Sequence, residues 1–197
     1  MSKNQKQLIL ASTSRYRRAL MEQAGFAVEC VAPDYDESLY ANPDPRETIA
    51  FHARGKALSV AARFPRDIVI GSDQGLIFGN ELIGKPYSIE AACAQLTRFR
   101  GHTVQIVTSL FVACQNEEKK CQNVAHLHFR EDLTDDAIRH YVEADKPLDC
   151  AGAFKIEARG SRLFSAIECD DPTAIQGLPL MALNAFILAF DPSYDAF

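Results

Sequence analysis

The sequence predicts an α/β fold with a mixed sheet and flanking helices, on three observations. Short apolar runs, typical of strands covered on both faces, alternate with helical patterns from residue 8 onward. Two long strand patterns, 104–114 and 124–129, follow each other around the polar link 115–120, as in an antiparallel pair. No repeat, low-complexity tract or long linker interrupts the 197 residues, so we expect a single domain over 1–197, built as one body or two closely packed lobes.

Four elements are expected in the first third of the chain. The apolar run 8–11 predicts a buried strand, and a helical pattern through 18–21 ends at Gly25. A second strand is expected at 27–31, before an acidic, proline-containing loop. Asp44, Pro45 and Glu47 form a capping-box-like start for a helix that runs to about Phe64.

The rest of the chain continues the alternation. Residues 68–70 predict a buried strand that ends in a loop at 71–74, and Gly79-Asn80 predicts a hairpin turn between 76–78 and 82–83. Further helices are expected at 88–99, 134–143 and 179–190, with Ser88 and Thr134 as N-caps, and a short strand at 163–167. Ligands of such folds collect where loops leave the carboxyl ends of strands, which favours the loops 11–14, 32–37 and 71–74.

Composition and charge exclude several classes of protein. The chain has 21 Lys and Arg against 26 Asp and Glu, a net charge of −5, which argues against a sequence-independent nucleic-acid binder. No apolar run approaches the roughly 20 residues of a membrane span, and the segment 8–11 is too short for a signal-peptide core, so we expect a cytoplasmic protein. The six cysteines form no C-x-x-C pair and predict buried free thiols in a reducing compartment.

Three arginines follow the first expected strand. Ser12-Thr13-Ser14-Arg15-Tyr16-Arg17-Arg18 places hydroxyls, amides and cations at a helix start. Cations at a helix N-terminus oppose its dipole unless something negative lies there, so this segment favours an anion site over a merely solvated basic turn. The chain has no phosphate-binding G-x-x-x-x-G-K-[ST] loop, which excludes a P-loop NTPase.

Carboxylates lie in two of the other expected loops. Asp73, after a buried strand, could be a general base, a metal ligand or a routine turn former. The run from Asp34 to Glu37, read alone, is more typical of a solvated acidic loop. Together with the arginines, these carboxylates could complete a site for a Mg²⁺–phosphate complex. Lys56 and Lys85 are next to the same elements, although either could be an ordinary surface residue.

A set of short motifs runs in order along nearly the whole chain: Leu8-Ile9-Leu10-Ala11-Ser12-Thr13-Ser14, Arg17-Arg18, Asp36-Glu37, Lys56, Gly71-x-Asp73, Gly84-Lys85-Pro86, Ala151-Gly152-Ala153-Phe154 and Gly177-Leu178-Pro179. Through this set the chain resembles the Maf-like nucleoside triphosphate pyrophosphatases. Within the family it is most similar to the bacterial 7-methyl-GTP pyrophosphatases, through Asp73-Gln74 and Phe154-Lys155-x-Glu157. The resemblance implies a Maf/inosine triphosphatase-like fold, with two closely packed lobes around an active-site cleft.

The resemblance also implies the reaction and its residues. The substrate would be cleaved between the α and β phosphates, with a divalent cation, Mg²⁺ or Mn²⁺, as cofactor. Ser12, Arg17, Arg18, Lys56 and Lys85 would hold the triphosphate, and Lys85 is also counted as catalytic. Asp73 would accept the proton of the attacking water, and both Asp73 and Glu37 would act at the metal. Arg15 stands where the family usually has proline and is left out of the predicted site.

Three further residues match positions that set specificity in the family: Tyr16, Gln74 and Glu157. 7-Methylguanine carries a delocalised positive charge, so an aromatic ring can stack on it with a gain of about 0.5–2 kcal/mol. Glu157 only accepts hydrogen bonds, which suits the donors of the guanine edge.

Two alternatives stay open at this point. The chain could hydrolyse dTTP and UTP with the same chemistry, or it could be a non-catalytic nucleotide-binding regulator of cell division. In each case the partner is a small nucleoside triphosphate, with neither a nucleic-acid polymer nor a membrane, and a homodimer is suggested only by analogy. For the enzyme, the implied role is to keep modified nucleotides out of RNA.

Overall fold

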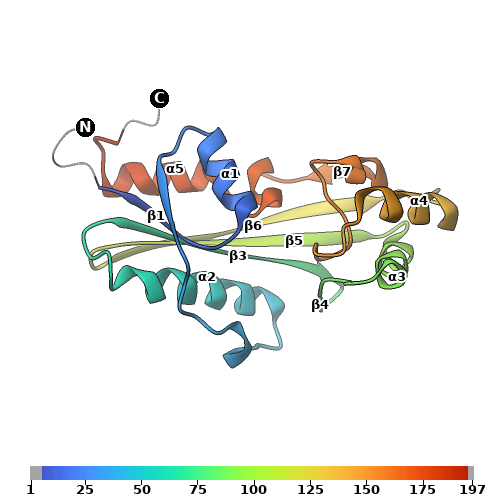
Figure 1. The fold of residues 1–197 in the computed structure, drawn as a ribbon, viewed down its shortest axis with the longest axis horizontal. Helices are drawn as coiled ribbons and strands as arrows, with labels where there is room; N and C mark the ends of the chain where they lie inside the picture. The colour runs from blue at the N-terminus through green and yellow to red at the C-terminus, as the bar shows by residue number, and fades with distance from the viewer. Residues whose placement is uncertain (1–5, 195–197) are drawn as a thin grey trace. The chain divides into compact units, whose positions relative to one another are not determined.

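A computed structural model describes residues 6–194, in which strands and helices alternate as expected (Figure 1). The strands are β1 (Leu8–Ala11), β2 (Val28–Val31), β3 (Ile68–Phe78), β4 (Glu81–Ile83), β5 (Thr103–Cys114), β6 (Glu117–Phe129) and β7 (Phe164–Glu168). The α-helices are α1 (Arg15–Gln23), α2 (Pro45–Ala61), α3 (Ile89–Phe99), α4 (Asp135–Asp145) and α5 (Leu180–Phe190). Short 3-10 helices within residues 6–194 are η1 (Glu37–Leu39), η2 (Arg159–Leu163) and η3 (Pro172–Gln176).

The strands form a mixed sheet in the order β2-β1-β3-β5-β6-β7, with β4 paired to β3. β1 pairs with β2 and β3 in parallel, whereas β3–β4 and β6–β7 are antiparallel. A parallel neighbour needs a crossover connection, and α1 and α2 supply it between β1, β2 and β3. The predicted mixed α/β fold is therefore confirmed.

The chain divides into two compact units. The first contains the residues up to Gln74, Thr108–Asn123 and the residues from Asp171 onward, and the second contains Gly75–Val107 and Val124–Asp170. The expectation of one domain over 1–197 stays a prediction.

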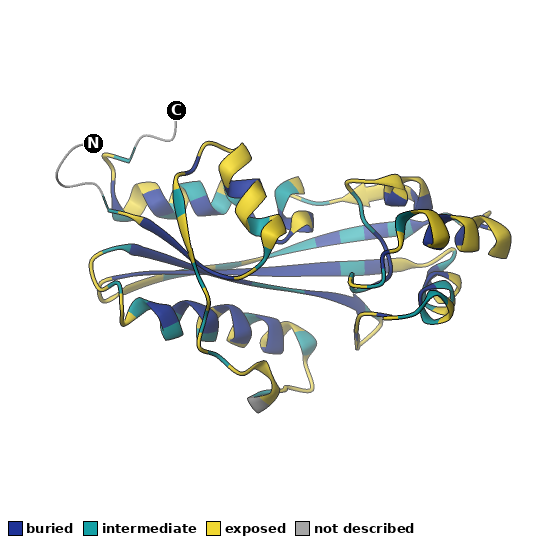
Figure 2. Ribbon diagram, in the orientation of Figure 1, coloured by how far each residue is buried: buried dark blue, intermediate teal, exposed yellow. Residues whose placement is uncertain are grey.

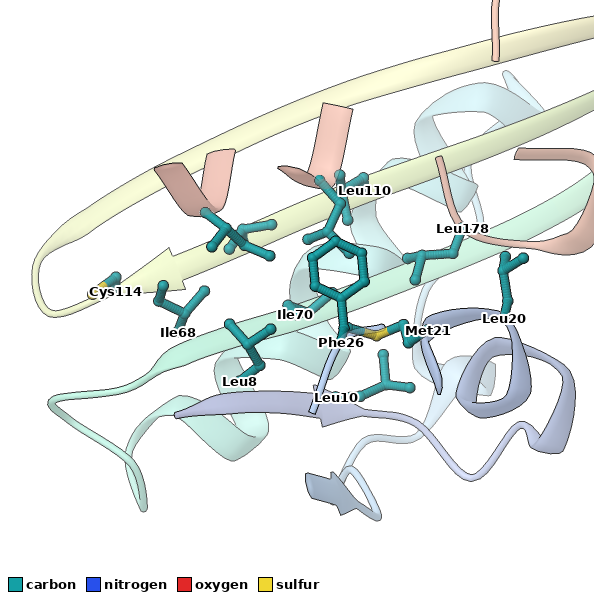
Figure 3. Packing of buried hydrophobic residues seen from close by; sticks show 13 residues of the cluster. Leu8, Leu10, Leu20, Met21, Phe26, Ile68, Ile70, Leu110, Cys114 and Leu178 are labelled. Carbon is teal, nitrogen blue, oxygen red and sulfur yellow. The ribbon is translucent and has the colours of Figure 1, made fainter. Parts of the chain in front are cut away.

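In the first unit, helices cover both faces of the sheet: α1 and α5 on one side and α2 on the other (Figure 1). Alternate side chains of β1 point to opposite faces of the sheet. Leu8 and Leu10 pack with Met21, Phe26 and the α5 side chains (Figure 3). Ile9 and Ala11 pack instead with Ala53, Ala57 and Val60 of α2. All four residues of β1 are buried (Figure 2), which explains its uninterrupted apolar sequence.

The second unit has an aromatic core. The Phe129 ring is in contact with the rings of Phe99, Phe154 and Phe164, whose centroids lie 4.7–6.0 Å from its own. Helices α3 and α4 pack together in this unit. Their predicted N-caps are confirmed: Ser88 accepts a hydrogen bond from the Ala91 amide and Thr134 from the Ala137 amide.

Three predictions about element boundaries were wrong. β3 does not end before 71 but continues through Asp73 and Gln74 to Phe78, so the third expected loop is strand. β6 begins at Glu117 rather than 124, and Gln115-Asn116 alone makes the turn after β5. The first half of β6 is polar because it is largely exposed, so it lacks the apolar pattern by which a strand is predicted. The helix from Pro45 ends at Ala61, three residues earlier than expected.

All six cysteines are free thiols, as predicted, but only Cys114 is buried and Cys30 is exposed. The prediction that they are buried was therefore wrong for most of them. Within residues 6–194, no helix is long and apolar enough to cross a membrane.

Candidate active site

An ammonium group joins two carboxylates in the first unit. Lys56 Nζ lies 2.6 Å from Asp73 Oδ1 and 2.7 Å from Glu37 Oε1. The Lys56 and Asp73 side chains are only 11% and 13% exposed, whereas that of Glu37 is 56% exposed. The structure thus brings together three residues that are 17 or more positions apart in the chain. We refer to Glu37, Lys56 and Asp73 as the ionic triad.

Two tightly packed elements position the Lys56–Asp73 pair. Lys56 lies on the buried face of α2, and Asp73 projects from β3 toward that helix. Gly71 permits this approach, since a Cβ there would lie 2.3 Å from the Ala53 carbonyl oxygen and 2.7 Å from Ala57 Cβ. α2 itself starts at the predicted cap, where the Asp44 side chain accepts from the Arg46 amide.

Glu37 reaches the triad from the loop after β2. Asp36 caps η1 by accepting from the Ser38 amide at 2.9 Å, which fixes the turn that presents Glu37. Burial pushes the pKa of Glu37 upward, but the hydrogen bond and charge of Lys56, with smaller contributions from His52 and Arg17, outweigh it. The net effect is a pKa below the ordinary value, so Glu37 is ionised at neutral pH.

The start of α1 contributes Ser12 and Arg17. Ser12 is buried and its Oγ accepts from the Ser14 amide, while Ser14 caps the helix by accepting from the Arg17 amide. Arg17 Nε donates to the Gly177 carbonyl at 2.8 Å, and Ser72 Oγ donates to the same oxygen. Burial lowers the pKa of the Arg17 guanidinium, and the charges of Asp73 and Glu37 oppose that shift. The Arg17 guanidinium is therefore within electrostatic range of both carboxylates of the triad.

The neighbouring side chains of α1 have other partners. Arg18 is exposed and pairs with Glu22 one turn along the helix, at 2.7 Å, so it is not gathered with the triad. Tyr16 is 40% exposed, as a stacking platform requires. The Arg15 guanidinium lies 5.0 Å from the centre of that ring and donates to its hydroxyl. Arg15, which was left out of the predicted site, thus contacts the ring that is predicted to stack on the base.

Gln74 has an internal set of partners. Its amide nitrogen donates to Thr108 Oγ1 and to the carbonyls of Ala174 and Ile175 in η3, at 2.8–3.1 Å. The side chain therefore fixes η3 against β3 and β5. A direct contact with a substrate base stays a prediction, but the amide nitrogen is already committed inside the protein.

Lys85 and Glu157 belong to the second unit, where both are exposed. Lys85 follows β4, and Glu157 lies in the turn that precedes η2. Their predicted roles in substrate binding stay predictions.

The donor set of the triad fits a hard divalent cation. Glu37 and Asp73 offer hard carboxylate oxygens, and one oxygen of each contacts Lys56 Nζ, so the ammonium group occupies the point on which these two oxygens converge. Within the described residues, no group of three or more His, Cys, Asp and Glu side chains could hold a metal alone. Mg²⁺ is commonly bound by one or two carboxylates plus waters and substrate phosphates, so two carboxylates are enough for a site that fills with its substrate.

Sequence reasoning missed two residues beside the triad. Tyr35 Oη lies 2.9 Å from His52 Nδ1, and His52 is buried one turn before Lys56 on α2. Burial, with the negative charges of Glu37 and Asp73, raises the pKa of Tyr35, so the phenol is neutral. The i, i+4 spacing of His52 and Lys56 was the available signal, since it places both on one helix face.

Comparison with known proteins agrees with this architecture. The family model for Maf-like proteins matches residues 7–190. The chain is 45% identical to a protein of Aromatoleum aromaticum named 7-methyl-GTP pyrophosphatase, covering 92% of this chain and 94% of that protein. It is 42% identical to a protein of the same name from Alkalilimnicola ehrlichii, with 92% of each chain covered. Among solved structures, the Staphylococcus aureus Ham1 protein is similar in fold, with a TM-score of 0.51 at 18% identity over 93% of this chain and 99% of that one.

Proposed function

The chain belongs to the Maf-like family, and from that premise we propose that it is a nucleoside triphosphate pyrophosphatase acting on 7-methyl-GTP. The products are 7-methyl-GMP and pyrophosphate. The ionic triad is the observation that carries the proposal, because a carboxylate held by an ammonium inside the protein is a preorganised acid–base site. The names of two relatives more than 40% identical to this chain support the choice of substrate.

The proposed reaction is a hydrolysis of the α–β anhydride. Asp73 accepts a proton from water as the water oxygen bonds to the α-phosphorus, and the bond from the α-phosphorus to the α–β bridging oxygen breaks, so that this oxygen leaves on pyrophosphate. Arg17 and Lys56 stabilise the negative charge that develops on the phosphate oxygens, since both are cations in a largely buried setting. Ser12 and the capped start of α1 favour an anion at that position.

We include a divalent cation, Mg²⁺ or Mn²⁺, in this proposal, with Asp73 and Glu37 as its protein ligands. When bound, such an ion polarises phosphate oxygens and lowers the pKa of a bound water. Glu37 suits this role because its depressed pKa keeps the carboxylate ionised over the physiological range.

For the base, we propose that the Tyr16 ring stacks on 7-methylguanine and that Glu157 accepts from its donor edge. The half-exposed ring supports the first role, and Arg15 shows that it already attracts a planar cation. Lys85 is proposed to bind phosphate. We further propose a cytoplasmic enzyme that removes modified nucleotides before RNA synthesis.

A nucleotide panel tests the proposal against its alternatives. Pyrophosphate release is measured with 7-methyl-GTP, GTP, UTP and dTTP at equal concentrations with Mg²⁺ or Mn²⁺. The expected result is the highest kcat/KM for 7-methyl-GTP. Faster turnover of UTP or dTTP contradicts the proposed substrate, and release from none of the four, with binding retained, favours a nucleotide-binding regulator.

A further inference from the structure

Glu37 is the most exposed member of the ionic triad and the only one that lies outside α2 and β3. Its side chain lies in a loop whose only regular element is the three-residue η1. A preorganised site needs every charged group held in place, and an ion pair with one partner more than half exposed, as Glu37 is, contributes less to such order than a buried pair. Something else must therefore hold this loop against α2.

Two aromatic pairs flank Glu37 in the sequence and join its loop to α2. Two residues before it, Tyr35 is hydrogen-bonded to His52 at 2.9 Å, with the rings edge to face at a centroid distance of 5.7 Å. Tyr40 lies three residues after Glu37, and its ring stacks on that of Phe51 with a centroid distance of 3.7 Å and an interplanar angle of 14°. We call Tyr35, Tyr40, Phe51 and His52 the aromatic clamp.

The helix surface is shaped for the first of these rings. A Cβ at Gly55 would lie 2.1 Å from Tyr35 Cε2 and 2.5 Å from Cζ, so the ring rests directly on the backbone of α2 at this residue. Any larger residue at position 55 must displace the ring. His52 is only 7% exposed, and the Tyr35 hydroxyl is its hydrogen-bond partner in that buried position.

We propose that the aromatic clamp is a positioning device that holds Glu37 on Lys56, so that Tyr35 and His52 influence the reaction through Glu37 alone. They are positioning residues. The effect on turnover rests on the proposed function, whereas the effect on the loop does not.

The test replaces Tyr35 with Phe, which keeps the ring on Gly55 and removes only the bond to His52. The net free energy of one such hydrogen bond corresponds to roughly a two- to tenfold change in the population of the loop that is held in place. We therefore expect kcat for 7-methyl-GTP to fall by roughly that factor, with KM little changed. His52→Leu should lower kcat by a similar factor. His52→Asn, which keeps an amide near the Nδ1 position, should retain most of the native kcat. Tyr194→Phe is the matched control, since that ring packs against Phe26 instead.

A double-mutant comparison separates positioning from a general structural role. In a Glu37→Gln background, adding Tyr35→Phe should leave kcat unchanged, because the group that the clamp positions has lost its charge. If Tyr35→Phe lowers kcat by the same factor in both backgrounds, or has no effect in the native one, the proposal is overturned.

Amide hydrogen exchange tests the clamp without any activity. In Tyr35→Phe we expect faster exchange at 36–40 and unchanged exchange in α5 of the same unit. Gly55→Ala, which displaces the ring, should give the same local pattern. Unchanged exchange at 36–40, or an equal rise in α5, overturns the clamp. If the native protein releases no pyrophosphate, the proposed function fails, and exchange still decides whether Tyr35 holds the loop.

Discussion

Gly71→Ala probes the link between packing and the active site most sharply. The added methyl group points from β3 into α2, where it would meet the Ala53 carbonyl oxygen at 2.3 Å and the Ala57 amide nitrogen at 2.8 Å. Both are backbone atoms of a helix, so no side-chain rotation relieves the clash. The helix that carries Lys56 must therefore move away from the strand that carries Asp73.

The size of the effect follows from these distances. The closest approach is about 1 Å shorter than ordinary van der Waals contact, so α2 must shift by about that much. Overpacking of a core costs about 1–3 kcal/mol. A shift of this size stretches the 2.6 Å contact between Lys56 Nζ and Asp73 beyond hydrogen-bond range. Misplacement of a catalytic group by about 1 Å can cost roughly a hundredfold in rate.

Thermal unfolding and pyrophosphate release from 7-methyl-GTP measure the two effects on the same sample. Gly84→Ala is the matched control for stability, because a Cβ there meets nothing within 4 Å. We expect a lower Tm and a large loss of kcat for Gly71→Ala and an unchanged Tm for Gly84→Ala. A Gly71→Ala protein with native Tm and native kcat would refute the argument that this glycine sets the Lys56–Asp73 distance.

Three further predictions concern titration and selectivity. The folded-state pKa of Glu37 lies below its ordinary value of 4.5, so its ionised form stabilises the fold above pH 4.5, and this contribution is lost as the pH falls through the lower folded-state value. Glu37→Gln should therefore flatten the dependence of Tm on pH below pH 4.5. Glu157→Gln should lower 7-methyl-GTP turnover relative to UTP by about tenfold, and an unchanged ratio removes Glu157 from base recognition. Burial raises the pKa of Cys150 to about 11 and also raises that of Cys30, but Cys30 is the exposed thiol, so alkylation at pH 8 should label Cys30 first; equal rates contradict this.

Local signals in the sequence predicted the helices well. Asp44, Ser88 and Thr134 cap α2, α3 and α4 as expected, because a cap satisfies amides within the same few residues and needs no tertiary contact. The apolar run of β1 likewise revealed burial on both faces.

Contacts that depend on tertiary structure were harder to predict. Gly71-Ser72-Asp73-Gln74 has the composition of a turn, yet pairing within the sheet and packing under α2 keep it as strand. The commitment of Gln74 to η3 joins residues 100 positions apart, and no local pattern could reveal it. The family resemblance named Glu37, Lys56 and Asp73 as site residues, whereas the contacts that join them and the neighbouring pair Tyr35 and His52 required the structure.

The central claim is that Asp73, held by Lys56, is the base of a pyrophosphatase. Asp73→Asn keeps the shape of the side chain and removes its capacity to accept a proton, so it tests that claim directly. With native Tm and native binding of 7-methyl-GTP, the variant should lose about 10²–10⁴-fold in pyrophosphate release. A folded Asp73→Asn protein that hydrolyses 7-methyl-GTP within a few fold of the native rate would contradict the account.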